Sequence, residues 1–212
     1  MGLARRRAIG ALVGAAAVLV GVSARAEVSG LEGALWIGEG EVVGSVNPSG
    51  RDQVLRSALV GLSASVRLDK LLIGASADVA GEPFGHVETF LTLHAGWSAP
   101  LGHGRLSILG EGGRHSYDEL GAGFLSESNA SGAALLFVGT RVAADVSTMV
   151  GGQGALFGIW LAVRQDLGTV MVRDAGAFTG PGEAYWRVGG TSILGGVRLG
   201  FDLDPRGLRA AP

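Results

Sequence analysis

Strict alternation of apolar and polar side chains is the feature that most constrains this 212-residue chain. In the decapeptide LLIGASADVA, residues 71–80, every second position from Leu71 onward is apolar, while the positions between them are mostly small or polar and include Asp78. Successive side chains of a β-strand point to opposite faces of the sheet. A period of two therefore predicts a strand with one apolar face and one polar face.

The same alternation recurs in segments of about ten or more residues, which are separated by clusters of Gly, Pro, Asn, Asp and Ser. The predicted strands are residues 31–43, 54–68, 71–80, 87–99, 105–115, 132–146, 155–166 and 185–203. A tilted strand needs about 9–11 residues to cross a hydrocarbon layer, and these segments are long enough. Alternation alone does not distinguish a membrane barrel, apolar on the outside, from a soluble sandwich, apolar on the inside.

The connections between the predicted strands alternate in length. Residues 69–70, 100–104 and 147–154 form short connections, whereas residues 44–53, 116–131 and 167–184 form longer ones. Residues 81–86 are the one short member of the second set. Short turns at one end and longer loops at the other are typical of an outer-membrane barrel.

The N-terminus has the three parts of a secretory signal peptide. Arg5, Arg6 and Arg7 are followed by an uncharged stretch, residues 8–22, and then by the small-x-small sequence Ala-Arg-Ala at 24–26. We expect cleavage after Ala26. An uncleaved anchor helix is the alternative, but the apolar stretch is shorter than the roughly 20 residues that span a bilayer.

Composition supports a membrane location. Hydrophobic residues make up 47% of the chain and charged residues only 17%, with a mean hydropathy of +0.37. Such a chain has little charge to cover a surface in water, so its apolar side chains must face lipid or partners. Loss of the signal peptide would leave 13 basic and 19 acidic residues, a net charge of −6, which disfavours nucleic-acid binding. The absence of cysteine excludes disulfides and thiolate metal sites.

The charges provide a test of a barrel with a polar interior. When each strand is oriented by its apolar residues, only Arg56, Arg114 and Arg187 from the second strand onward point outward, all near the long-loop end. This placement matters because an Arg or Lys on the lipid face at mid-bilayer costs about 2–4 kcal/mol. We predict that a polar network inside the barrel contains Arg67, Asp78, Glu88, His94, Arg105, Glu111, Arg141, Asp145, Arg164, Asp166, Arg198 and Asp202.

The aromatic residues divide in the same way. Trp97, Phe157 and Phe201 have outward parity near the short-turn end, and Tyr185 near the other, as expected for residues at membrane interfaces. Trp36, Phe137 and Trp160 have inward parity. Large side chains alternating with glycines fill the interior of an eight-stranded barrel, which argues against a wide pore.

Taken together, these features resemble the eight-stranded outer-membrane barrels of Gram-negative bacteria, such as the OmpA transmembrane domain and the opacity-type surface proteins. In the last strand, LGGVRLGF at 194–201, Gly196, Leu199 and Phe201 match the family's signal for the barrel-assembly machinery, although Leu194 replaces a polar residue and DLDPRGLRAAP follows. The resemblance implies a closed, antiparallel, all-β up-and-down transmembrane barrel at residues 27–203, a signal peptide at 1–26 and a short tail at 204–212. It also implies a location among outer-membrane lipid and lipopolysaccharide.

Catalytic and cofactor motifs are weak. His115 and Ser116 lie together at the long-loop end of a strand, and a rim-located lipid hydrolase is the chemistry that they suggest. ESNASG at 127–132 is similar to a motif of lipid A deacylases, but Ser126 stands where the histidine would be. The scattered histidines predict no metal site. The glycine-rich stretches 151–154 and 180–183 do not lead from a strand into a helix, so we predict no bound cofactor.

Three functions remain open at this point. We expect a non-enzymatic outer-membrane barrel that acts as an anchor or subunit of a cell-envelope assembly, such as a motility, secretion or adhesion machine. Its partners would be other envelope proteins, bound through the long loops or the periplasmic end. The alternatives are a lipid or lipopolysaccharide hydrolase using His115 and Ser116, and a narrow ion or solute channel.

Overall fold

The structure is a computed structural model that describes residues 28–46, 50, 52–81, 87–117, 133–150, 153–173 and 185–203. The predicted signal peptide, the predicted tail at 204–212 and most of the predicted loop at 116–131 lie outside the described residues. No helix in the described ranges is long and apolar enough to cross a membrane.

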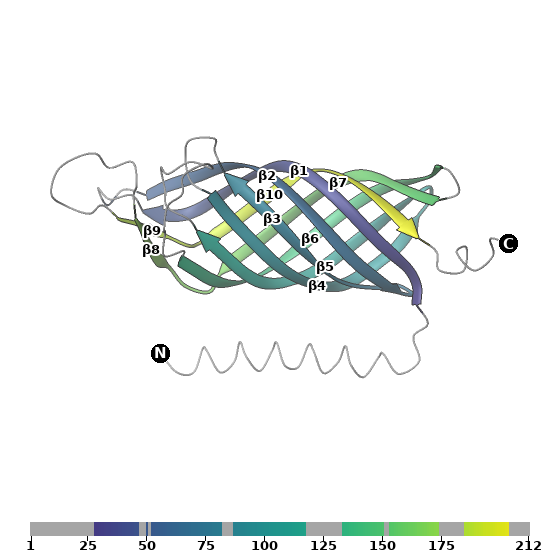
Figure 1. Cartoon of the computed structure of the whole chain (residues 1–212), viewed down its shortest axis with the longest axis horizontal. Coiled ribbons are helices and arrows are strands. Elements are labelled where there is room, and N and C mark those ends of the chain that lie inside the picture. The colour runs from purple at the N-terminus through teal and green to yellow at the C-terminus, as the bar shows by residue number, and fades with distance from the viewer. Residues whose placement is uncertain are drawn as a thin grey trace, which may run out of the picture.

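Eight long antiparallel strands form a closed barrel (Figure 1). They are β1 (Val28–Val46), β2 (Asp52–Leu68), β3 (Leu71–Gly81), β4 (Val87–Leu101), β5 (Gly104–Tyr117), β6 (Ala133–Val150), β7 (Gln153–Asp166) and β10 (Thr191–Leu203). Each strand pairs with its neighbour along the chain, and β10 pairs with both β7 and β1. The ring therefore has no free edge, which a sheet surrounded by lipid requires because lipid cannot hydrogen-bond to open backbone groups. The predicted closed, antiparallel, all-β barrel is confirmed.

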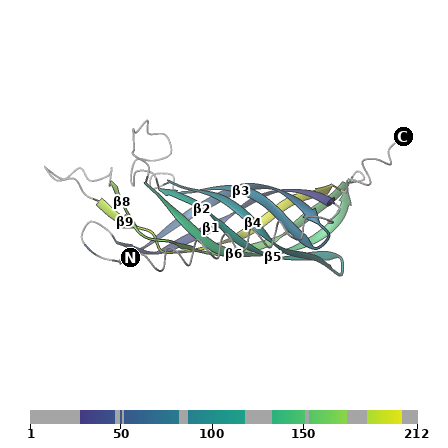
Figure 2. The ribbon, with the colours of Figure 1, turned by 90° about the horizontal axis from the view of Figure 1, so that it is seen from below.

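The prediction of residues 185–203 as a single strand is wrong. Its first part is β9 (Tyr185–Val188), which pairs with β8 (Val170–Arg173) in a hairpin, and only β10 belongs to the barrel wall. Gly189 has a φ of 116°, in a region that residues with a side chain rarely adopt, so the chain changes direction there. The predicted loop at 167–184 therefore contains β8. The hairpin lies at the long-loop end of the barrel (Figures 1 and 2).

The two ends of the barrel differ as the loop lengths predicted. At one end the strands are joined by Asp69 and Lys70, by residues 102–103 and by residues 151–152. The third connection is shorter than the predicted 147–154, because β6 and β7 continue pairing to Val150 and Gln153. We call this the short-turn end. The four longer connections, including the β8–β9 hairpin, lie at the opposite, long-loop end.

The outer surface of the barrel is apolar. Among the exposed side chains are Leu62 at 60%, Leu93 at 72% and Ile159 at 64% relative exposure. The aromatic residues Trp97, Phe157 and Phe201 are also exposed on this face, near the short-turn end. A continuous apolar band of this kind is stable only against lipid, since soluble monomers rarely expose apolar patches of more than a few hundred Å².

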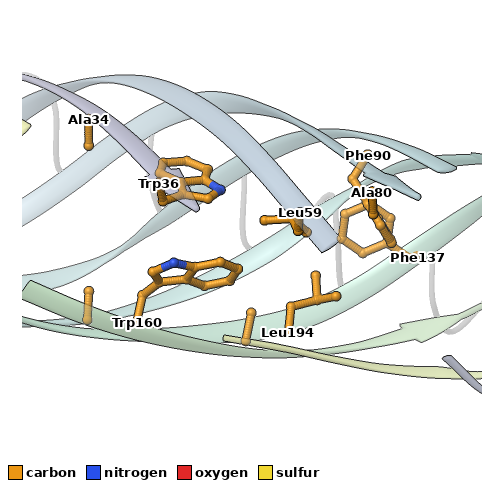
Figure 3. Packing of buried hydrophobic residues seen from close by; sticks show 10 residues of the cluster. Ala34, Trp36, Leu59, Ala80, Phe90, Phe137, Trp160 and Leu194 are labelled. Atoms are coloured by element: carbon orange, nitrogen blue, oxygen red, sulfur yellow. The ribbon is translucent and has the colours of Figure 1, made fainter. Parts of the chain in front are cut away.

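The inside of the barrel is packed. A cluster of buried apolar residues lines the interior, with Trp36 of β1 near Trp160 of β7 and Phe90 beside Phe137 (Figure 3). The two tryptophan rings lie 5.9 Å apart, and the two phenylalanine rings meet edge to face at 5.8 Å. Glycines face several of these side chains: at Gly61, for example, a Cβ would collide with the Trp36 ring. Pairing a large side chain with a glycine is how a barrel of this size fills its interior.

Candidate functional site: the charged interior of the barrel

The structure places all twelve residues of the predicted polar network inside the barrel. Nine are buried, and Arg67, Arg105 and Asp202 are partly buried near the short-turn end. The three arginines predicted to point outward, Arg56, Arg114 and Arg187, are exposed. The interior residues form three clusters along the barrel axis, which we describe from the short-turn end to the long-loop end.

The short-turn cluster consists of three arginines and three carboxylates: Glu32, Arg67, Arg105, Asp145, Arg198 and Asp202. Arg67 and Arg105 both donate to the Asp202 carboxylate, the first at 2.6 Å. Arg105 also donates to Glu32 at 2.7 Å, and Arg198 approaches the same carboxylate at 2.6 Å. Arg198 Nε lies 3.2 Å from Asp145. The chain of contacts joins β1, β2, β5, β6 and β10, so it connects walls that do not pair directly.

The central cluster consists of Asp78, Glu111, Arg141 and Arg164. Arg141 Nε and Arg164 Nε lie 2.6 Å and 2.8 Å from the two oxygens of Glu111. Arg164 Nη2 lies 2.9 Å from Asp78, which also accepts a hydrogen bond of 2.8 Å from the Trp36 indole. All four side chains are almost fully buried. Two positive and two negative charges therefore neutralise one another in the middle of the barrel.

Aromatic rings surround the two central arginines. Arg141 lies over Trp36 at 4.5 Å and near Trp160 at 5.4 Å, while Arg164 lies 4.7 Å from the Phe90 ring and 5.1 Å from Phe137. The face of an aromatic ring is electron-rich and attracts a guanidinium. The four rings therefore fill the space between the ion pairs, and their faces attract the two guanidinium groups.

The mouth cluster lies at the long-loop end and contains Glu88, His115, Tyr117 and Asp166. His115 Nε2 lies 3.1 Å from Glu88, and Nδ1 lies 3.0 Å from Asp166. Tyr117 donates a hydrogen bond of 2.9 Å to the same Asp166 carboxylate. The His115 ring stacks on Phe90 at 3.8 Å, which connects this cluster to the central one. All four side chains are buried.

The β8–β9 hairpin covers the mouth cluster. Val188 of β9 is fully buried against Tyr117 and Val42, with Leu135 and Val170 packed around them. The backbone N–H of Gly190, which follows the hairpin, donates to Asp166 at 3.1 Å. The Gly190 carbonyl also accepts hydrogen bonds from the Asp166 backbone N–H at 2.8 Å and from Gln165 Nε2 at 3.1 Å. Apolar contacts and these hydrogen bonds thus hold the hairpin across the end of the barrel. We call this group of contacts the cap.

His94 stands apart from the three clusters. It is buried and hydrogen-bonded through Nε2 to Ser65 Oγ at 2.9 Å, while its Nδ1 has no hydrogen-bond partner among the described residues. No group of three potential metal ligands occurs in the part of the chain that the structure describes.

The structure separates the two residues of the hydrolase hypothesis. His115 points into the barrel between two carboxylates, whereas its neighbour Ser116 has the opposite parity and points outward. Adjacent residues of a strand face opposite sides of the sheet, so His115 cannot act as a base for Ser116 from these positions. The described geometry therefore does not favour the two residues as a nucleophile–base pair, and the hydrolase alternative stays a prediction.

Sequence reasoning missed Glu32 and Tyr117. Glu32 has the same parity on β1 as the inward-facing Trp36, and extending the charge analysis to the first strand would have found it. Tyr117 lies two residues beyond the predicted end of its strand, because β5 continues past His115. Its role depends on Asp166, 49 residues away, and no local pattern reports that contact.

The three residues that match the assembly signal lie on β10. Leu199 and Phe201 are exposed on the outer surface, at 56% and 50%. Gly196 pairs with Gly38 of β1, and a Cβ at Gly196 would collide with the β1 backbone. The proposed role of this strand in recognition by the assembly machinery stays a prediction.

No protein-family model matches this chain, and no curated protein matches its sequence. Solved structures do match its fold. Neisserial surface protein A aligns with a TM-score of 0.54 over 82% of this chain and 96% of that one, at 9% sequence identity. The outer membrane protein OprG from Pseudomonas aeruginosa aligns with a TM-score of 0.50 over 84% and 98% of the two chains, at 12% identity. The chain thus has the fold of a small outer-membrane β-barrel.

Proposed function

We propose that this chain is a non-enzymatic protein of the Gram-negative outer membrane that serves as an anchor or subunit of a cell-envelope assembly. It is exported by the signal peptide at residues 1–26, and the barrel-assembly machinery inserts it by reading Gly196, Leu199 and Phe201. Other envelope proteins then bind it at its loops or at its periplasmic, short-turn end. The apolar outer band supports the membrane location.

One observation carries the anchor role: the interior is filled along its length by mutually paired side chains. Ion pairs occupy the short-turn end and the centre, and the cap closes the mouth. Buried ion pairs do little for stability compared with apolar packing, yet removing one partner is strongly destabilising. Such an interior fixes the barrel as a rigid, closed body, which leaves its ends and its outer wall as the surfaces for function.

Co-purification from outer membranes after mild detergent extraction tests this role. We expect stable companions, and surface variants should show which end binds them. Met171→Glu alters an exposed residue of β8 at the long-loop end, and Lys70→Glu is its matched control in an exposed turn at the short-turn end. One of the two variants should lose a companion that the other keeps. Recovery of the chain alone from every extraction would contradict the anchor role.

A narrow ion path is the second candidate, because titratable side chains follow one another from Arg67 at the short-turn end to His115 at the mouth. Conductance across planar bilayers distinguishes it from a closed anchor. We expect no steady conductance from the unaltered chain, since every passage would require breaking buried pairs. Stable single-channel steps would favour the ion path over the anchor.

A further inference from the structure

Two charged side chains lie on the outer wall of the barrel, away from the strand ends, without an ion-pair partner among the described residues; Asp52, which is also exposed and without one, is the first residue of β2 at the long-loop end. Glu39 of β1 and Arg114 of β5 both have outward parity and are exposed. They differ from Glu41 and Arg56, which are also exposed on the outside but form a 2.9 Å ion pair with each other. A single unpaired charge facing lipid is unfavourable, so each of the two positions needs an explanation.

The two charges lie at matching heights. Glu39 is six residues beyond Gly33, whose partner across the strands is the girdle residue Phe201. Arg114 is six residues beyond Ile108, whose partner is the girdle residue Trp97. Both strands run from the short-turn end to the long-loop end. Six residues of a strand tilted by about 40° rise roughly 15 Å, which places both side chains in the half of an apolar band about 25 Å tall that is nearer the long-loop end.

The two charges also lie on opposite sides of the molecule. The ring runs β1, β2, β3, β4, β5, β6, β7 and β10 before it closes on β1, so β5 is four strands from β1 in either direction. The Glu39 side of one barrel therefore faces the Arg114 side of a second barrel when the two stand next to each other in the same orientation. Translation alone relates such copies.

We propose that the Glu39 side of the barrel binds the Arg114 side of a second copy of the same chain, so that the Glu39 carboxylate of one barrel pairs with the Arg114 guanidinium of the next. Because the two surfaces are different and lie on opposite sides, the contact does not close on itself, and it produces rows of barrels in the membrane plane. The attraction between the charges is stronger in this part of the membrane than in water, because the dielectric constant falls from the interface toward the acyl chains.

Small residues beside the two charges allow this contact, while the exposed Leu91 of β4 and Leu136 of β6, which lie across from Arg114, would pack around the pair. Glu39 lies between Ala58 of β2 and Gly195 of β10, neither of which reaches beyond the carboxylate. Next to Arg114 on the same outward face of β5 is Gly112, where a Cβ would meet nothing closer than a backbone oxygen at 3.6 Å. Small residues at membrane interfaces allow backbones to approach closely. This inference goes beyond the anchor role and requires only that the barrel lie in the outer membrane.

Cysteine cross-linking tests the proposal. The chain has no cysteine of its own, so any cross-link must come from the introduced residues. In the proposed contact β2 of one copy faces β4 of the next, so Ala58→Cys and Leu91→Cys flank the charge pair while leaving both charges in place. A short bismaleimide added to outer membranes should join chains that carry both cysteines into a ladder of dimers, trimers and longer products. Chains with either cysteine alone should give no dimer, because the contact joins unlike surfaces.

The matched control uses the strands a quarter turn away. Ala75→Cys on β3 and Leu161→Cys on β7 also lie on opposite sides and at matching heights, four residues beyond Leu71, the partner of Trp97, and beyond Phe157. This pair should cross-link only at the low level that random collisions give.

Charge variants identify the contact. In the Ala58→Cys/Leu91→Cys chain, Glu39→Arg should lower the ladder yield by about tenfold, since like charges then meet across the interface. Adding Arg114→Glu exchanges the two charges and should restore the ladder. Glu39→Gln, which keeps the shape, should lower the yield in the same direction. Heat-dependent gel mobility verifies that each variant is a folded barrel.

The proposal would be overturned by a ladder that neither Glu39→Arg nor Glu39→Gln weakens, by a control pair that cross-links equally well, or by dimers from a single cysteine. A lack of any ladder in folded, membrane-inserted chains would also overturn it and would leave lipid phosphate as the partner of Arg114. None of these results depends on companions or conductance, so failure here is distinct from failure of the anchor role.

Discussion

The short-turn and central clusters differ from the mouth cluster in the groups that neutralise their buried carboxylates. In the short-turn and central clusters, five arginines face five carboxylates. At the mouth, the carboxylates of Glu88 and Asp166 both contact the His115 imidazole, with Tyr117 and the Gly190 backbone as further donors to Asp166. Among the described residues, Asp166 pairs with the His115 imidazole and not with an arginine.

Because the mouth cluster uses a histidine where the other clusters use arginines, its contacts depend on the protonation of a side chain. Arginine stays charged in proteins, so the five guanidiniums neutralise their carboxylates at any ordinary pH. A neutral imidazole has one N–H and one lone pair, so it can donate to Glu88 or to Asp166 but not to both. The mouth cluster therefore needs one further proton, on the imidazole or on a carboxyl group, to satisfy both contacts. The centre of the barrel has no such requirement.

Removal of a central arginine should have the largest effect on stability. Arg164→Leu leaves Asp78 and Glu111 facing only Arg141, and breaking a buried ion pair in this way costs about 3–5 kcal/mol. Urea unfolding in lipid vesicles, followed by tryptophan fluorescence, measures the change. Arg56→Leu is the control, because its pair with Glu41 is exposed and should contribute about 0–1 kcal/mol. Equal effects of the two variants would show that the central pairs are not buried as described.

Neutralising one carboxylate in the central cluster and one in the mouth cluster should reduce stability by different amounts. Glu111→Gln leaves two buried arginines sharing Asp78, so we expect a loss of about 2–4 kcal/mol. Glu88→Gln should cost less than Glu111→Gln, because a neutral imidazole can then donate to Asp166 and accept from the amide. The same unfolding experiment compares them. A larger loss for Glu88→Gln would mean that the mouth carries a fixed positive charge.

The smallest effect concerns one hydrogen bond in the mouth cluster. Tyr117→Phe removes the donor to Asp166 but keeps the ring that packs under Val188, so we expect a loss of about 1 kcal/mol. Hydrogen exchange of the Gly190 amide is the sensitive measurement, since that N–H donates to the same carboxylate. Faster exchange than in the unaltered chain is expected. Unchanged exchange and unchanged stability would show that the cap does not depend on this bond.

Much of the wall was predictable because alternation is a local property of the backbone. Seven of the predicted strands match β1 to β7 within a few residues, and the predicted facing of Asp78 and Leu62 agrees with their burial and exposure. The eighth failed because residues 185–188 alternate like a strand and do form one, but in a hairpin with β8 instead of in the wall. Sequence pattern reports that a segment is extended, and it does not report which strand it pairs with.

The sequence by itself determined which side chains of each strand share a face, because a strand turns successive side chains to opposite sides wherever it lies. Only the tertiary structure decided which inward groups meet. Arg67 and Asp202 are 135 residues apart and Arg198 and Glu32 are 166 apart, and both pairs join because the barrel closes between β10 and β1. Closure also sets Glu39 and Arg114 on opposite sides of the barrel. Those distances depend on strand number and stagger, which no single strand encodes.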